Sequence, residues 1–188
     1  DSCGIGFVVN IDGTRAHSLI EEGITILNKL EHRGAVGSDQ KSGDGAGMML
    51  QIPHRFLKKV VPFELPGAGA YGVGFLFLPK ERKQLEQARQ MVDEISDREG
   101  FRVLGWREVP HNPDCIGDVA RKSIPALRQV FLQHRSLEDQ EELERKFFIL
   151  RKCIENNAFS RGWEMDDFYV SSLSASTIIY KGMFVSQQ

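Results

Sequence analysis

The stretch Tyr71-Gly72-Val73-Gly74-Phe75-Leu76-Phe77-Leu78 carries the strongest single indication of the fold. Its apolar residues are typical of a buried β-strand. Because side chains alternate between the two faces of a strand, Gly72 and Gly74 leave one face nearly bare. Another layer of structure can then lie close against that face. The sequence therefore predicts a strand that is covered at short range by a second layer.

Helices and further strands are expected on either side of this strand. The helices follow Ser18, Pro79 and Ser136, where apolar residues recur at intervals of three and four. We expect Ser18 and Ser136 to cap their helices, with Glu21 completing a capping box at the first. Strands are expected over residues 5–10, 48–52, 101–109, 124–133, 168–173 and 177–180. The segment 124–133 is ambiguous between strand and helix, and we favour a strand. Groups of strands with helices between them predict an α+β fold.

Composition places the chain among soluble globular proteins. At 188 residues, with 41% hydrophobic and 27% charged residues, it suits one domain or a large piece of a bigger one. The net charge of -2 and the lack of a basic stripe argue against binding to nucleic acid. No apolar run approaches the roughly 18 residues of a membrane span, so no membrane partner is expected. Three well-separated cysteines indicate neither a disulfide framework nor a zinc site, and they predict a reducing, cytoplasmic compartment.

The glycine-rich segment Gly43-Asp44-Gly45-Ala46-Gly47 invites comparison with phosphate-binding loops, but it does not fit them. It lacks the Lys-Ser/Thr pair of a P-loop and precedes a strand, whereas phosphate-binding loops open a helix. We interpret it as a loop that shapes the backbone. The five histidines show neither i, i+4 pairing nor an H-E-x-x-H pattern, so no metal site is expected.

The start of the chain, Asp1-Ser2-Cys3-Gly4-Ile5-Gly6-Phe7, carries the sharpest chemical signal. A thiol that is backed by a strand and flanked by glycine is placed for nucleophilic attack if Asp1 and Ser2 are removed. The freed α-amino group, with a pKa of about 8, would serve as a base beside a thiol with a pKa of about 8.5. The alternative is that Cys3 is a small buried hydrophobic residue, which is the commoner role of a lone cysteine.

Six segments distributed along the chain bear on these two interpretations of Cys3. They are Cys3-Gly4-Ile5-Gly6-Phe7, Glu31-His32-Arg33-Gly34-Ala35, Ser42-Gly43-Asp44-Gly45-Ala46-Gly47, Gly105-Trp106-Arg107-Glu108-Val109-Pro110, Asp167-Phe168-Tyr169-Val170-Ser171-Ser172-Leu173-Ser174 and Ile179-Tyr180-Lys181-Gly182-Met183. In this order and spacing they resemble the glutamine amidotransferase domain of the glutamate synthase family. The likeness covers essentially the whole chain, and the Gly-Asp-Gly-Ala-Gly loop points to the glutamate synthase branch of the class II amidotransferases.

The resemblance implies a four-layer αββα fold of the N-terminal-nucleophile type, in which two stacked sheets lie between layers of helices. It also implies that Cys3 attacks the side-chain amide of L-glutamine, releases ammonia and forms a thioester that water hydrolyses. Arg33 and Gly34 would shape the pocket around Cys3, or Arg33 would only tie the end of a helix to a loop. Asp44 is expected to brace its own loop rather than to touch substrate.

The family pattern also sets an expectation about completeness. The family's substrate-binding Arg and the Asn-Gly pair of its oxyanion hole would lie beyond Gln188. Residues 1–188 are therefore expected to be the first part of one amidotransferase domain, with an incomplete fold. Alone they should be nearly inactive, because removing one oxyanion donor costs on the order of a hundred- to a thousand-fold in rate. Asp1 and Ser2 depart from the family pattern, in which the mature chain begins at the cysteine.

No cofactor is expected in this chain itself. The resemblance implies FMN and an iron-sulfur cluster in the full-length enzyme, where ammonia is passed to 2-oxoglutarate. The implied partners are L-glutamine, the remainder of the glutamate synthase polypeptide and a reductase subunit. Two alternatives stay open, namely a non-catalytic assembly or interaction fragment with an open sheet edge, and another class II amidotransferase.

Overall fold

The computed structural model describes residues 4–37, 39, 41–136, 139–183 and 185. The chain divides into two compact units. The larger unit comprises the described residues of Met49–Pro110 and Pro125–Ile179. The smaller unit comprises the described residues of Asp1–Met48, His111–Ile124 and Tyr180–Gln188. The two units are described separately below.

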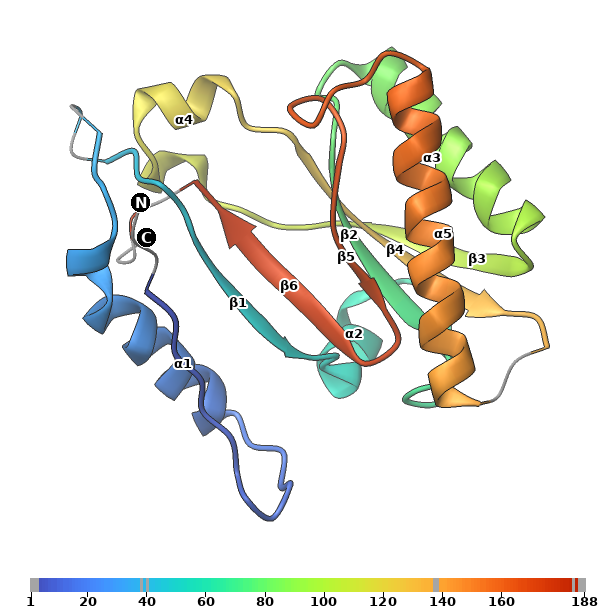
Figure 1. Ribbon diagram of the computed structural model, residues 1–188, viewed down its shortest axis with the longest axis horizontal. Coiled ribbons are helices and arrows are strands. Elements are labelled where there is room, and N and C mark those ends of the chain that lie inside the picture. The colour runs from blue at the N-terminus through green and yellow to red at the C-terminus, as the bar shows by residue number, and fades with distance from the viewer. Residues whose placement is uncertain (1–3, 38, 40, 137–138, 184, 186–188) are drawn as a thin grey trace. The chain divides into compact units, whose positions relative to one another are not determined.

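An antiparallel sheet of four strands forms the centre of the larger unit (Figure 1). Its strands are β2 (Gly72–Leu78), β3 (Phe101–Glu108), β4 (Ala126–His134) and β5 (Tyr169–Ser174). The spatial order is β3-β4-β2-β5, so β2 is hydrogen-bonded on both edges, to β4 and to β5. The segment 124–133, ambiguous in the sequence, is therefore a strand, as we favoured.

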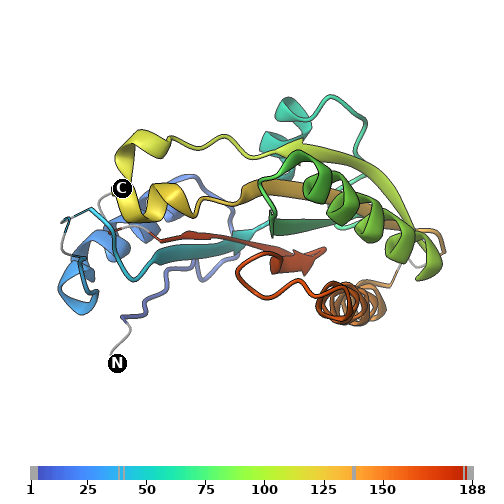
Figure 2. The same ribbon diagram turned by 90° about the horizontal axis from the view of Figure 1, so that it is seen from above.

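Two long helices, α3 (Arg82–Arg98) and α5 (Gln140–Ser160), share one hydrophobic core with this sheet. Figure 1 shows the two helices side by side, and Figure 2 shows α5 nearly end on. The core contains the apolar residues that recur along each helix, including Ala88, Met91, Val92 and Ile95 from α3, and Leu143, Phe147, Leu150 and Ile154 from α5. These are the residues whose spacing predicted the buried faces of the helices, and that prediction is confirmed.

The glycine face of β2 receives a side chain from α5. A Cβ atom on Gly72 would lie only 2.6 Å from Cε2 and 2.8 Å from Cε1 of Phe147, which is itself fully buried. The predicted close layer is thus the aromatic ring of a helix residue. Val73 and Phe75, on the opposite face, are also buried, at 0% and 2% exposure. The strand is therefore enclosed on both faces as well as on both edges.

The helix starts differ from those predicted. Helix α1 (Ser18–Lys29) has His17 at its N-cap with no side-chain cap, so Ser18 is already the first helical residue and the predicted capping box is wrong. Helix α5 begins after Asp139, whose carboxylate accepts a hydrogen bond from the amide of Glu142 at 2.8 Å. Ser136 and Asp139 are both favourable N-cap residues, and the helix uses the second.

Residues 5–10 do not form the predicted strand. They have no regular secondary structure, and no β-ladder joins them to another described segment. A strand exists only when its backbone pairs with another strand, and this segment has no such partner within the described part of the chain. Instead it runs beside α1, since a Cβ atom on Gly6 would clash with the side chain of Ile26. The large side chains of Ile5 and Phe7 are 95% and 89% exposed.

A second, two-stranded sheet pairs β1 (Ala46–Gln51) with β6 (Thr177–Gly182). The short helices α2 (His54–Val60) and α4 (Asp118–Lys122), and the 3-10 turns η1 (Glu31–Arg33) and η2 (Pro113–Cys115), were not predicted. Mixed α and β structure with antiparallel sheets agrees with the α+β class. None of the helices built from described residues is both long enough and apolar enough to cross a membrane.

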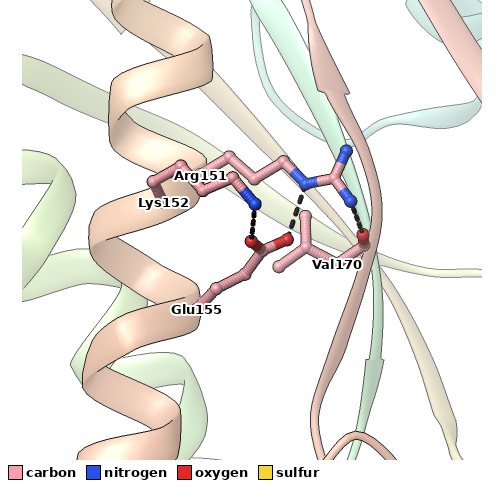
Figure 3. Close-up of polar contacts among 4 residues, drawn as sticks. All are labelled: Arg151, Lys152, Glu155 and Val170. Carbon is pink, nitrogen blue, oxygen red and sulfur yellow. Dashed lines mark hydrogen bonds and ion pairs between the residues drawn. The ribbon is translucent and has the colours of Figure 1, made fainter.

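A polar network fastens α5 to the edge strand of the four-stranded sheet (Figure 3). Arg151 donates through Nη2 to the carbonyl of Val170 on β5 at 2.9 Å, and through Nε to Glu155 Oε1 at 2.7 Å. Lys152 donates to the other oxygen of Glu155 at 2.7 Å. Burial opposes ionisation of Glu155, but the hydrogen bonds from Lys152 and Arg151 prevail and lower its pKa. The carboxylate therefore holds the arginine in the orientation that reaches β5.

The Gly72 contact predicts a steric cost for any side chain there. We expect Gly72→Ala to lower the free energy of unfolding by about 1–3 kcal/mol, because Phe147 must leave its place. Urea denaturation measures the difference. Gly67→Ala is the matched control, since no atom of the described residues lies within 4 Å of a Cβ atom at that position. Equal stability of the two variants would contradict the proposal that Phe147 needs the space left by the missing side chain of Gly72.

The Glu155 network predicts a pH-dependent contribution to stability. Because the folded-state pKa of Glu155 is lowered, its stabilisation is present at neutral pH and disappears as the pH falls through that lowered value. Glu155→Gln should therefore lower the free energy of unfolding by about 0.5–1 kcal/mol at neutral pH and make little difference in acid. Glu141→Gln, which removes an exposed pair with Arg145 at 3.9 Å, should have almost no effect at either pH. A loss that is independent of pH would rule out the electrostatic explanation.

Candidate active site

Cys3, the predicted nucleophile, lies outside the described residues, and the description begins at its neighbour Gly4. Gly4 rests on the end of α1, where a Cβ atom would lie 2.9 Å from Leu30 Cδ2 and 3.3 Å from Arg33 Cβ. Such distances leave no room for a side chain without movement of Leu30. The residue that follows the predicted nucleophile is therefore packed directly against Arg33.

Arg33 and Gly34, the two predicted pocket residues, form the turn that leaves α1. The amide of Arg33 donates to the carbonyl of Leu30 at 2.8 Å, and the amide of Gly34 donates to that of Glu31 at 3.1 Å. The Arg33 side chain is exposed. Within the described part of the chain its guanidinium has no hydrogen bond or ion pair.

The loop that follows is a short ladder of hydrogen bonds. At its base, the amide of Ala35 donates to Asp44 Oδ2 at 2.9 Å, and the amide of Asp44 donates to the carbonyl of Ala35 at 3.2 Å. Val36 and Gly43 form a bridge above this pair. Next, the amide of Gly37 donates to the carbonyl of Ser42 at 2.6 Å. Asp44 thus braces its own loop, as predicted.

At the tip of this ladder, Asp39 is hydrogen-bonded to the residues that follow it. Its carboxylate accepts hydrogen bonds from the amides of Lys41 and Ser42, at 3.1 and 2.8 Å, and from the hydroxyl of Ser42 at 2.7 Å. These bonds, above all the one from the Ser42 hydroxyl, lower the pKa of Asp39. The carboxylate is therefore ionised at neutral pH and serves as the acceptor around which the tip folds.

The glycines after the ladder shape the backbone where it enters β1. Gly45 has a φ of +115°, in the region that favours glycine, and a Cβ atom there would lie 2.9 Å from the carbonyl oxygen of Gly182. A Cβ atom on Gly47 would lie equally close to the carbonyl oxygen of Tyr180. The loop therefore approaches β6 at a distance that only glycine permits. This agrees with a backbone-shaping loop and not with a phosphate-binding one.

Of the other quoted motifs, Gly105–Pro110 has a packing role in the larger unit. Trp106 on β3 donates through Nε1 to Asp93 on α3 at 2.9 Å, and burial raises the pKa of that carboxyl. The guanidinium of Arg89 lies 5.4 Å from the centre of the Trp106 ring. This tryptophan therefore holds α3 on the sheet. The contacts of the motif stabilise the fold and give no indication of a catalytic role.

Comparison with known proteins identifies the family. The model of the class II glutamine amidotransferases matches residues 3–188. The chain is 40% identical to the glutamate synthase [NADPH] large chain of Bacillus subtilis (strain 168), over all of this chain and 12% of that protein. It is 37% identical to the ferredoxin-dependent glutamate synthase 1, chloroplastic/mitochondrial, of Arabidopsis thaliana, over 99% of this chain and 12% of that protein.

A third relative, the glutamate synthase [NADPH] large chain of Azospirillum brasilense, is 38% identical over all of this chain and 12% of its own length. The chain thus spans about an eighth of the length of these curated relatives, 12% in each case. The resemblance to glutamate synthases that the motifs indicated is confirmed. Because the family match extends from residue 3 to residue 188, the chain belongs to the class II glutamine amidotransferases.

Proposed function

We propose that this chain is the first part of the glutaminase domain of a glutamate synthase, and that Cys3 is its nucleophile. The observation that carries the proposal is the position of the family match, whose first residue is Cys3. The packing of Gly4 against the Cβ atom of Arg33 adds support, because it places a predicted pocket residue beside the start of the matched region. The substrate is L-glutamine, and the products are glutamate and ammonia.

The reaction follows from the chemistry of an N-terminal cysteine. Once Asp1 and Ser2 are removed, the α-amino group of Cys3, with a pKa of about 8, accepts the thiol proton near neutral pH. The sulfur then attacks the side-chain amide carbon of glutamine. The carbon–nitrogen bond breaks, and the nitrogen leaves as ammonia with the proton returned by the amine. A water molecule next attacks the thioester, which releases glutamate and restores the thiol.

Arg33 and Gly34 are proposed to form one wall of the glutamine pocket. The exposed guanidinium, without a hydrogen bond or ion pair to the rest of the described chain, is suited to a carboxylate, which arginine binds through two parallel hydrogen bonds. Gly34 continues the turn in an extended conformation, with φ -95° and ψ 153°. The ladder that begins at Ala35 fixes the direction in which this turn leaves α1.

We propose that residues 1–188 are one part of an αββα domain and that later segments complete it. The relatives are about eight times longer than the matched region, which is 12% of each. The apolar side chains of Ile5, Phe7 and Ile11 are almost fully exposed. In the described residues β1 and β6 pair only with each other, so each has an open edge. The same features would suit a non-catalytic assembly fragment, which the labelling experiment below distinguishes.

The cofactors of glutamate synthases are proposed to lie elsewhere in the full-length polypeptide. Among the residues that the structure describes, no group of three or more histidine, cysteine, aspartate or glutamate side chains is placed to hold a metal. Cys115 and Cys153 belong to different units, so they do not lie together as ligands of one cluster. These residues do not fit an iron-sulfur cluster. FMN, the cluster, the transfer of ammonia to 2-oxoglutarate and any reductase subunit are therefore assigned to the remainder of the polypeptide.

Active-site labelling tests the role of Cys3. A diazo ketone analogue of glutamine should alkylate Cys3 in full-length protein that begins at this residue, and mass mapping should find a single adduct. Cys3→Ser should abolish labelling, whereas Cys115→Ser, which changes an exposed thiol, should leave it intact. Protein that retains Asp1 and Ser2 should react at least about a hundred times more slowly, because its amide nitrogen is no base. Adducts on Cys115 or Cys153 with Cys3 unmodified would refute the assignment.

A further inference from the structure

Asp39, at the tip of the ladder between Ala35 and Asp44, has no part in the reaction described above. We propose that Asp39 is a positioning residue, which seats the loop tip against Gly117 and thereby holds Arg33 and Gly34 in the geometry that binds glutamine. This inference rests on the proposed glutaminase function. It assigns a role to a segment, His111–Ile124, that the sequence did not connect with the site.

Contacts run without a break from Gly4 to the tip of the loop. Gly4 packs on Arg33, and the turn through Gly34 leads directly into the pair formed by Ala35 and Asp44. The bridge between Val36 and Gly43 and the bond from Gly37 to Ser42 extend this pair to the tip. Each rung is made by backbone atoms or by a short side chain. We therefore expect a movement of the loop tip at Asp39 to move the base of the loop at Ala35 as well.

The tip of the loop contacts the backbone at Gly117 through Asp39. A Cβ atom on Gly117 would lie 2.9 Å from Asp39 Cγ, and still closer to Asp39 Oδ2 and to Ser42 Oγ. Gly117 is buried, and its φ of -68° and ψ of 161° are open to any residue. Glycine is thus needed here for space and not for backbone conformation. The missing side chain is what lets the hydrogen-bonded pair of Asp39 and Ser42 lie on the backbone.

The contact between Asp39 and Gly117 holds the tip of the loop in place. Without an anchor at the tip, the ladder is a narrow two-stranded loop, which is only marginally stable alone. With Asp39 seated on Gly117, the loop is held at its base by α1 and at its tip by the start of α4, whose Arg121 amide donates to the carbonyl of Gly117 at 2.9 Å. The pocket wall at Arg33 is therefore supported from both ends.

Steady-state kinetics of glutamine hydrolysis by the full-length enzyme tests this role. Asp39→Ala and Gly117→Ala should each raise KM for glutamine about tenfold and change kcat less than about threefold, because they misplace a binding wall and not the nucleophile. Asp39→Asn keeps an oxygen that can accept from the amides of Lys41 and Ser42, so it should restore most of the affinity. The double variant should resemble Asp39→Ala alone, because that change removes the carboxylate that the new methyl group would strike.

Two controls separate positioning from a general loss of structure. Asp114→Ala removes an exposed partner of Arg121, 3.7 Å away beside the same helix, and should leave KM unchanged. Labelling by the diazo ketone, which needs the glutamine pocket, should slow about tenfold in Asp39→Ala. Labelling by iodoacetamide, which needs only a reactive thiol, should keep its rate.

Three results would overturn the inference. The first is that the wild-type enzyme is active and that KM for glutamine is the same in Asp39→Ala and Gly117→Ala as in the wild type. The second is slowing of both labelling reagents together with a lower melting temperature, which would mark a structural role. A wild-type enzyme that neither hydrolyses glutamine nor reacts at Cys3 would instead refute the proposed function, and this inference with it.

Discussion

The contact between the ring of Phe147 and the bare backbone of Gly72 is the constraint on which the larger unit depends. It sets how closely α5 approaches the sheet, because a single Cβ atom at that point would overlap the ring. Phe147 and the apolar residues along the same face of α5 join α3 and the sheet in one core. Close packing makes such a core intolerant of small changes in spacing. The polar network from Arg151 to β5 fixes the same helix at the sheet edge.

Close contacts at glycine also occur in the smaller unit. The missing side chain lets Leu30 approach Gly4, the backbone of β6 approach Gly47, and Asp39 approach Gly117. Only some of these positions need the special conformation of glycine. Gly45 has a φ of +115°, whereas Gly117 has an ordinary backbone and needs only the space. Glycine therefore serves in two different ways in this chain, and a count of the 18 glycines does not distinguish the two.

How far the sequence predicts this structure depends on the range of the interaction concerned. The apolar periodicity of α3 and α5 and the strands β2 to β5 were predicted, because each pattern reports one buried face. Residues 5–10 have a strand-like composition, yet a strand also needs a partner, which no local pattern supplies. The start of α5 was misplaced because Ser136 and Asp139 are both good caps. The contact of Asp39 with Gly117 joins residues far apart in the chain, and no sequence pattern near either residue predicts it.

The candidate site shows why the family can be recognised from several motifs, although the residues next to Cys3 alone do not reveal its role. A lone cysteine beside a glycine is chemically ambiguous, and only the ordered set of distant motifs decides its interpretation. The structure adds a physical reason for that order. The turn at Arg33 leads into the hydrogen-bonded ladder between Ala35 and Asp44, which ends in the glycine-rich loop, and Gly4 packs on Arg33. The spacing between these motifs is therefore set by the length of α1 and of the loop. An insertion in α1 would therefore separate the proposed pocket wall at Arg33 from the proposed nucleophile, even with every motif residue retained.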